Sequence, residues 1–198
     1  MTHPLDEDHP EDDAATPLTP AERADLIPSY ISLRQELNEA EQIGIANADQ
    51  WAFSRKRDVL FEGFLLRLHR RMFSDVWRWA GQYRTSERNI GVDHWTIAIE
   101  LRNLLDDTRF WIANQTYSSD EIAIRFHHRL VLIHPFPNGN GRHARLTADL
   151  LVVALGRSRF SWGRTSLTDA GETRRRYVAA LRQADRHNIT PLLTFARL

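Results

Sequence analysis

The stretch His134-Pro-Phe-Pro-Asn-Gly-Asn-Gly-Arg-His-Ala-Arg145 decides both the fold and the chemistry expected of this chain. It opens with a histidine and holds two prolines, a Gly-Asn-Gly core and two arginines. Proline ends a helix because it lacks the backbone donor and clashes with the preceding turn. Glycine lets the backbone adopt the turn that leads into a new helix. We therefore expect a sharp connection between two helices at these residues.

The segments on both sides of this loop have helical patterns. Ser118-Ser119-Asp120-Glu121 reads as a capping box that starts the first helix. Its apolar face is formed by Ile122, Phe126, Leu130 and Ile133. A second helix is expected to follow the loop and to run to Gly156.

Helical spacing recurs through most of the remaining chain. Thr19-Pro20-Ala21-Glu22 predicts another capped start. The other expected helices are Ser29 to about Ala48, one capped by Ser54 that includes Met72, Thr96 to about Asn114, one around Asp169–Asp185 and one from Thr190. Arg84–Trp95 contains Gly91 and β-branched residues, which favours a short β-hairpin or an irregular flap. The predicted fold class is mainly α, a helical bundle with a short β-hairpin flap near the active site.

Composition limits the class of protein. The 198 residues suit one domain, and the formal net charge is zero. Residues 1–25 form an acidic, proline-containing segment that we expect to be disordered, and residues 26–198 form the body. The first 20 residues hold six acids and no Lys or Arg, so the remainder is mildly basic. Such a surface suits an anionic ligand without demanding nucleic acid.

Cysteine and hydropathy exclude further classes. The chain has no cysteine, so a disulfide framework and a cysteine nucleophile are excluded. No apolar run reaches the length of a membrane span, and the acidic start is the opposite of a secretory leader. We expect a cytoplasmic protein with neither membrane nor nucleic acid among its partners. His127 and His128 are interpreted as packing or surface residues rather than metal ligands.

The loop has the parts of a site for phosphate chemistry. Backbone N–H groups at a glycine-bearing turn into a helix form an anion nest, and Gly139 and Gly141 allow a phosphate to come close. Arg142 and Arg145 are three residues apart and share a helix face, so they can clamp a polyphosphate. His134 stands at the opposite end of the loop, where a general base could take a proton from a hydroxyl.

These residues resemble the motif of the Fic family, H-x-F-x-[D/E]-G-N-G-R-x-x-R, at every fixed position except Asn138. Trp79-Ala-Gly-Gln-Tyr-Arg84 is similar to the family's W-A-G-x-x-R, and Tyr177 to Asp185 resembles its Y-x-x-x-L-x-x-A-N. The resemblance covers about residues 26–198. Within the family, the sequence resembles the bacterial group called mobile mystery protein B, named for its linkage to mobile elements.

The resemblance implies a role for each matched residue. His134 corresponds to the general base, Phe136 to the buried anchor of the loop, and Arg145 to the clamp on the terminal phosphate of ATP. The remaining nucleotide-binding and phosphate-binding residues that it implies are Asn138, Gly139, Asn140, Gly141, Arg142, Tyr177 and Asp185. The flap residues that align the target peptide are Ile90, Gly91 and Val92. Asp185 departs from the family, which usually has Asn there.

Asn138 is the departure that bears on the metal. The family's acid at this position holds Mg²⁺, which prefers charged oxygen ligands. The Asn138 amide oxygen can bind Mg²⁺ but brings no charge, so substrate phosphates would supply most ligands. We therefore expect ATP as the substrate, with Mg²⁺ bound between its phosphates and Asn138.

The resemblance also suggests regulation. Many family members carry an inhibitory helix with the pattern [S/T]-x-x-x-E-[G/N], and Ser32-Leu-Arg-Gln-Glu36-Leu37 matches its first part. One hypothesis is that Glu36 pairs with Arg145 and blocks productive phosphate binding. The alternative is that Glu36 is an ordinary solvated residue of a helix. Self-inhibition and a small inhibitory partner both stay open.

Three functions remain in order of preference. The first is a protein adenylyltransferase that moves AMP from ATP to a Ser, Thr or Tyr hydroxyl of a target protein. The second is a phosphotransferase or another nucleotide-derived group transfer on the same fold. The third is a catalytically silent nucleotide-binding module, which Asn138 makes plausible.

Overall fold

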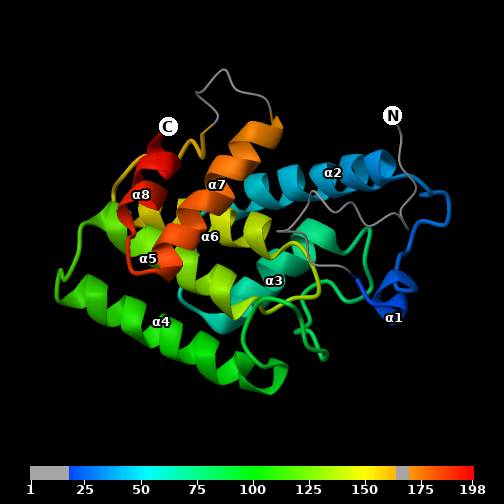
Figure 1. Ribbon diagram of the computed structural model, residues 1–198, viewed down its shortest axis with the longest axis horizontal. Coiled ribbons are helices and arrows are strands. Elements are labelled where there is room, and N and C mark those ends of the chain that lie inside the picture. Colours follow the sequence, from blue (N-terminus) through cyan, green and yellow to red (C-terminus); the bar gives the residue numbers. More distant parts are fainter. Residues whose placement is uncertain (1–17, 164–169) are drawn as a thin grey trace.

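The computed structural model describes residues 18–163 and 170–198, and within them the chain is mainly helical, as the sequence predicts (Figure 1). In chain order the elements are α1 (Pro20–Arg23), α2 (Arg34–Phe53), α3 (Glu62–Phe73), the 3₁₀ helix η1 (His94–Thr96), α4 (Ile97–Ala113), α5 (Ser119–Ile133), α6 (Asn140–Ala154), α7 (Ala170–Asp185) and α8 (Thr190–Arg197).

The helices α5 and α6 form the centre of the bundle. They pack along each other, and α5 also contacts α4 and α8. In the view of Figure 1, α4 lies below α5, while α7 and α8 lie above it. The helices α2 and α3 pack together and both touch α6. The loop between α5 and α6 is therefore held from several sides.

The helix α5 forms as its sequence predicts. Ser118 caps it, because its hydroxyl oxygen accepts a hydrogen bond from the Glu121 N–H at 3.3 Å. The four apolar residues at helical spacing are all buried: Ile122, Phe126, Leu130 and Ile133. The helix ends at Ile133, directly before His134 and Pro135. The cap at Ser118, the buried apolar residues and the proline after the last turn thus all support the helix that the sequence predicts.

The boundaries of α2 and α3 differ from the prediction. The helix α2 starts at Arg34 and ends at Phe53, and Ser54 is its C-terminal cap rather than the start of α3. The Ser54 hydroxyl donates to the Trp51 carbonyl at 2.8 Å. A serine hydroxyl can serve either end of a helix, and its sequence position alone does not say which. The next helix begins only at Glu62.

The predicted capping box at Thr19 is confirmed. The Thr19 hydroxyl accepts from the Glu22 N–H at 3.3 Å, and the Glu22 carboxylate accepts from the Thr19 N–H at 2.8 Å. Glu22 also forms an ion pair with Arg88, far along the chain. The short helix α1 thus lies within the segment 1–25 that the sequence analysis sets apart from the body. The part of the predicted disordered segment before Leu18 lies outside the described residues.

The segment 84–93 contains no strand, so the predicted β-hairpin is not formed and the flap is irregular. Its backbone donors turn to the neighbouring loop. The Arg84 N–H donates to the Pro135 carbonyl at 2.9 Å, and the Val92 N–H donates to the Ile133 carbonyl at 3.5 Å. The Arg84 guanidinium donates to the carbonyls of Ser86, Val92 and His134. These hydrogen bonds give backbone groups of the flap the partners that a second strand would provide in a hairpin.

Side chains from α2 to α8 form one continuous hydrophobic core. Burying each large apolar side chain of this kind contributes roughly 1.5–3 kcal/mol. In the part of the chain that the structure describes, none of the helices combines the length and apolar character needed to cross a bilayer.

Candidate active site

The loop between α5 and α6 turns through two residues in the left-handed region. His134 has φ 52° and ψ 58°, and Gly139 has φ 77°. At Gly139 a Cβ atom would lie 2.6 Å from the Phe73 ring, so both conformation and space require glycine. A non-glycine residue pays about 1–2 kcal/mol for this conformation. His134 carries that strain, which is typical of residues held in place for function.

Phe136 anchors the loop, as the sequence predicts. Its side chain is fully buried and stacks on His69 with 3.7 Å between ring centroids. The Asn140 amide closes the loop around it by accepting from the Phe136 N–H at 2.9 Å and donating to the Phe136 carbonyl at 2.8 Å. The Asn140 side chain is thus used for loop structure, and only its backbone remains at the start of α6 for an anion.

His69 joins three segments and was not identified from the sequence. Its Nδ1 accepts from the Gly81 N–H at 3.0 Å, so its Nε2 carries the proton and donates to the Asn138 carbonyl at 3.0 Å. Burial lowers the pKa of His69 well below 6.5 and keeps it neutral. A polar residue on the buried stripe with Leu65, Leu68 and Met72 was the signal that could have found it.

His134 is placed to act as a base. It is 6% exposed, and burial lowers its pKa from 6.5 to about 4, with the nearby Arg84 cation acting in the same direction. The Val131 backbone opposes this shift through a hydrogen bond. The imidazole is therefore neutral at pH 7 and has a lone pair that can accept a proton.

The flap lies directly against His134. Gly91 has φ 104°, and a Cβ there would lie 2.7 Å from the His134 Cβ and 2.8 Å from an Arg84 nitrogen. Val92 is tied to the end of α5 through Ile133. The structure therefore brings Gly91 and Val92 beside His134, while Ile90, 39% exposed, points to the surface. Their predicted role in aligning a target peptide stays a prediction.

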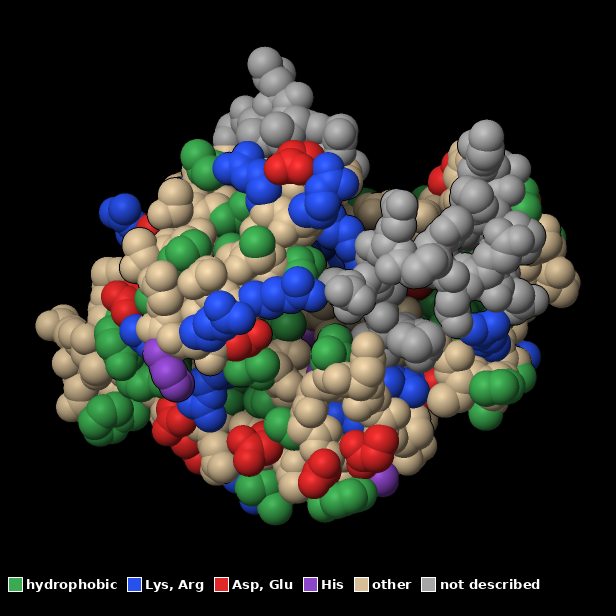
Figure 2. Space-filling view, viewed as in Figure 1, with side chains coloured by type: hydrophobic (Ala, Val, Ile, Leu, Met, Phe, Trp, Pro, Cys, Tyr) green, Lys and Arg blue, Asp and Glu red, His purple; other side chains and the backbone are tan. Residues whose placement is uncertain are grey.

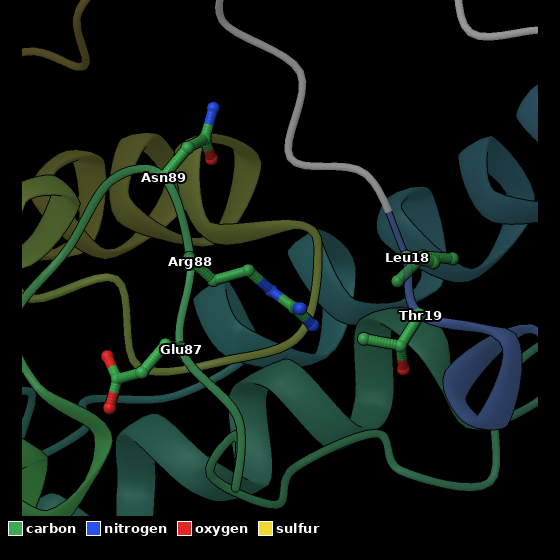
Figure 3. Close-up of a pocket in the computed structure, with 5 residues that line it drawn as sticks. All are labelled: Leu18, Thr19, Glu87, Arg88 and Asn89. Carbon is green, nitrogen blue, oxygen red and sulfur yellow. The ribbon is translucent and has the colours of Figure 1, made fainter.

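The far end of the flap meets the start of α1. Figure 3 shows the surface depression there, about 400 Å³ in volume and lined by Leu18, Thr19, Glu87, Arg88 and Asn89. Arg88 reaches across this junction to Glu22, which also caps α1. The flap is thus fixed at one end by α1 and at the other by Arg84.

The first turn of α6 offers space for an anion. A Cβ built on Gly141 would meet no atom closer than 3.8 Å, and the atoms at that range are an Arg145 guanidinium nitrogen and the Tyr177 hydroxyl. The N–H groups at this helix start carry a partial positive charge. Figure 2 shows Lys and Arg side chains gathered over α7 on the same face of the molecule. Backbone donors and Arg145 thus favour a phosphate at Gly141.

The two motif arginines have different partners. Arg142 forms an ion pair with Glu41 of α2 and lies 3.5 Å from the Asn138 amide oxygen. Glu41 is 4% exposed and also accepts from the Trp77 indole N–H at 2.8 Å. The sequence reading missed Glu41. The signal was an acid on the face of α2 that carries Leu37 and Ala48.

Glu36 does not contact Arg145 as hypothesised. Its carboxylate accepts from the backbone N–H groups of Ser32 and Leu33 at 2.9 and 3.0 Å. It therefore serves the start of its own helix, where a negative charge is favourable. Among the described residues no ion pair joins Glu36 to Arg145, whose guanidinium lies 5.1 Å above the Tyr177 ring.

The two residues matched to the adenosine side lie on α7. Tyr177 is buried, and its hydroxyl lies 2.9 Å from Nε2 of His127. Asp185 is 2.8 Å from Nε2 of His128 at the surface. The structure thus places Tyr177 beside Arg145 and Asp185 near the end of α7. Their contacts with a nucleotide stay predictions.

The residues present do not form a Mg²⁺ site by themselves. The Asn138 amide oxygen already accepts from the Gly139 N–H at 2.5 Å and faces the Arg142 guanidinium. A hard cation prefers charged oxygen ligands, and a neighbouring guanidinium opposes its binding. Within the described residues there is no group of three His, Asp or Glu side chains that could hold a metal.

Comparison with known proteins agrees with this geometry. The family model described as Fic/DOC family matches residues 60–152. The protein adenylyltransferase fic-1 of Caenorhabditis elegans is 29% identical over 150 residues, which make up 72% of this chain and 27% of that protein. A solved segment of C. elegans Fic-1 has a TM-score of 0.67 and 27% identity, covering 89% of this chain and 52% of that one.

A third likeness concerns the fold alone. The BepC protein of Bartonella tribocorum, solved with bound AMPPNP, has a TM-score of 0.66 and 18% identity, covering 90% of this chain and 97% of that one. The chain spans about a quarter of the length of the curated C. elegans relative that it matches. The matched segment, the shared fold and the loop from His134 to Arg145 lead to one conclusion: residues 60–152 of the chain form a Fic/DOC family segment.

Proposed function

We propose that the protein is an adenylyltransferase that moves AMP from ATP to the hydroxyl of a Ser, Thr or Tyr side chain in a target protein. The observation that carries this proposal is a neutral, buried His134 between the flap and an anion-binding helix start. Relatives in nematodes carry the name protein adenylyltransferase, and a structure with the same fold contains AMPPNP, an ATP analogue.

The reaction follows from the positions of these groups. The target hydroxyl gives its proton to the imidazole of His134, and its oxygen attacks the α-phosphorus of ATP. A new phosphorus–oxygen bond forms to the target, and the bond to the bridging oxygen of pyrophosphate breaks. The negative charge that develops on pyrophosphate faces the start of α6 and Arg145. Gly91 packs directly against His134, where an added Cβ would come within 2.7 Å of the His134 Cβ, so glycine keeps the flap beside the base.

Mg²⁺ in this proposal arrives with the nucleotide. Phosphate oxygens are ligands that Mg²⁺ prefers, whereas Asn138 offers one neutral oxygen that is already engaged. Arg145 and the α6 start therefore carry the charge neutralisation that comes from the chain itself. We place the activity in the cytoplasm, where ATP is abundant.

Self-restraint is a second part of the proposal. The carboxylate of Glu41 holds Arg142 and competes with phosphate for its charge. Glu41 thus takes the place that the sequence had suggested for Glu36. A small inhibitory partner would be needed only if this internal contact left the site active.

Asn138 favours a second candidate, the transfer of phosphate or of another nucleotide-derived group. A changed charge at this position alters how the polyphosphate lies along the loop, and therefore which phosphorus faces the hydroxyl. A silent nucleotide-binding module is the third candidate, since fold alone is weak evidence for activity.

Intact-mass spectrometry after incubation with ATP and Mg²⁺ separates the three candidates. Addition of AMP to the protein itself or to a lysate protein supports adenylyl transfer. Addition of phosphate alone supports the second candidate, and binding of ATP without any mass change supports the third. His134→Ala is expected to abolish the modification, and full activity in that variant would refute His134 as the base.

A further inference from the structure

Arg142 and Arg145 are three residues apart, but their side chains contact different kinds of partner. Arg142 is neutralised by Glu41. In the part of the chain that the structure describes, no acidic side chain pairs with Arg145, although the residue is partly buried. A long cationic side chain without an acidic partner needs another means of keeping one orientation, because free rotamers cost entropy when they are fixed on binding.

Tyr177 supplies a support for Arg145. The guanidinium carbon of Arg145 lies 5.1 Å from the centre of the Tyr177 ring, in the range of a cation–π contact. The Arg145 cation also lies close enough to the buried Tyr177 hydroxyl to oppose the rise in the pKa of Tyr177 that burial causes. Tyr177 itself is held against Phe195 of α8, with 5.7 Å between their ring centroids.

A hydrogen bond of the Tyr177 hydroxyl extends the support to His127. A guanidinium only donates hydrogen bonds, so Arg145 cannot accept the hydroxyl proton of Tyr177. The hydroxyl proton is then available for Nε2 of His127, 2.9 Å away. This arrangement needs a neutral His127, and burial lowers the pKa of His127 to about 3. Near neutral pH the Tyr177 hydroxyl therefore donates to His127, and this bond holds the ring over which Arg145 lies.

His127 is itself held in a fixed position by the residues around it. It is fully buried on α5, and its ring lies 4.8 Å from that of Trp162. The Ala144 backbone of α6 contacts it as well. His127 on α5 thus holds Tyr177 on α7, and Tyr177 lies under Arg145 on α6. Residues from three helices therefore orient this one guanidinium.

The supported cation lies at the anion-binding turn. A Cβ built on Gly141 would be 3.8 Å from an Arg145 nitrogen and 3.9 Å from the Tyr177 hydroxyl. Both groups therefore cover the first turn of α6. A phosphate at this turn would meet an Arg145 that is already oriented, so little rotamer entropy is lost when the phosphate binds.

We infer that Tyr177 and His127 are positioning residues that orient Arg145 for the distal phosphates of the nucleotide. The inference rests on the proposed use of ATP at this site, and it adds His127, which lies outside the motif, to the phosphate-binding machinery. It also assigns the Tyr177 ring to Arg145 and the Tyr177 hydroxyl to His127, rather than to adenosine.

The test compares the binding of ATP and AMP to the full chain by titration calorimetry. Tyr177→Phe keeps the ring under Arg145 and removes the hydroxyl. His127→Phe keeps an aromatic ring but removes the acceptor. We expect both variants to bind ATP about five- to tenfold more weakly, a loss typical of one hydrogen bond between neutral groups. AMP has no distal phosphates, so its affinity should stay within about twofold, as the same energy scale implies.

Two controls separate positioning from folding. His127→Gln restores an acceptor and should recover most of the ATP affinity. Tyr117→Phe alters another tyrosine that lies under an arginine, Arg125 at 4.2 Å, and should leave ATP binding unchanged. In a double-mutant cycle, Tyr177→Phe should add no further loss once Arg145 is replaced by Ala.

Equal losses for ATP and AMP, or ATP binding like wild type in both Tyr177→Phe and His127→Phe, would overturn the inference. Because binding is the readout, the outcome is distinct from that of the proposed function. A wild-type protein that binds ATP but transfers nothing would contradict the adenylyltransferase and leave the support intact. A wild-type protein that binds no ATP would overturn both.

Discussion

Glu41 of α2 and Arg142 of α6 form a partly buried ion pair across 101 residues of sequence. The second carboxylate oxygen of Glu41 accepts from the Trp77 indole at 2.8 Å, so the acid is held on both sides. The first motif arginine is thus neutralised before any phosphate arrives. Coulomb repulsion between Glu41 and a phosphate at the loop opposes nucleotide binding.

Glu41→Gln should therefore tighten ATP binding. Removing one negative charge near the phosphates is worth about 1–2 kcal/mol at an effective dielectric near 20, which is roughly five- to thirtyfold in affinity. Calorimetric titration with ATP measures the change. The matched control is Glu39→Gln, an exposed acid of the same helix that contacts Gln35. Unchanged or weaker ATP binding in Glu41→Gln, with the protein folded, would contradict the restraint.

Gly91→Ala should strongly reduce transfer. The added Cβ would come within 2.7 Å of the His134 Cβ and 2.8 Å of an Arg84 nitrogen, so the flap or His134 must move. Gly156→Ala is the matched control, since Gly156 has φ 83° but no atom within 4 Å of an added Cβ. Both variants pay about 1 kcal/mol of backbone strain, and only the first distorts the site. Transfer rates by intact mass should differ at least tenfold between them; equal rates would show that the contact with His134 is unimportant.

Arg84→Lys should loosen the flap. The Arg84 guanidinium serves three carbonyl groups, at Ser86, Val92 and His134, and an ammonium group cannot reach all three with the same geometry. Leaving buried carbonyl groups without a donor costs about 1–3 kcal/mol. Hydrogen exchange of the Val92 amide should become faster, and the urea midpoint should fall. Arg78→Lys, at an exposed position nearby, should change neither.

Stability should fall as the pH drops below neutral. Burial lowers the pKa of His127 to about 3 and the pKa values of His134 and His143 to about 4, whereas the unfolded chain titrates near 6.5. The unfolded state therefore binds protons first, and stability that is fully present above pH 6.5 is lost below it. The loss is about 1 kcal/mol for each such histidine at pH 5.5. Urea unfolding at pH 7.5 and 5.5 measures it.

His143→Gln gives the control for this pH dependence. The His143 ring bonds the Leu65 carbonyl at 3.0 Å, and a glutamine amide can donate to the same oxygen. The variant should lose part of the acid sensitivity and keep the fold. An unchanged slope of stability against pH would show that the buried histidines do not cause it.

Much of the local structure was readable from the sequence. The capping box at Thr19 forms as predicted, the Ser118 hydroxyl caps α5, and the helix that follows the loop begins at Asn140. Phe136 anchors the loop, and Gly139 adopts a positive φ. These features depend on residues three or four apart and on the conformational limits of single residues, which the sequence states directly.

Other expectations failed because a local pattern has more than one use. Ser54 ends α2 instead of starting α3, because a hydroxyl can cap either terminus. The Glu36 carboxylate accepts a hydrogen bond at the N-terminus of its own helix, and Arg145 lies over the Tyr177 ring instead of pairing with Glu36. The flap is irregular because Arg84 satisfies its carbonyl groups in place of a second strand.

By itself, the sequence determined the helical class, the loop from His134 to Arg145 and the general kind of chemistry, because these follow from periodicity, capping and backbone freedom. Only the tertiary structure decided which partners surround that loop. Glu41 reaches Arg142 across 101 residues, and His69 reaches Asn138 across 69. Such contacts arise when α2 and α3 pack against α6 and bury polar groups that must then find partners. No short pattern in the sequence specifies which partner each buried group will meet.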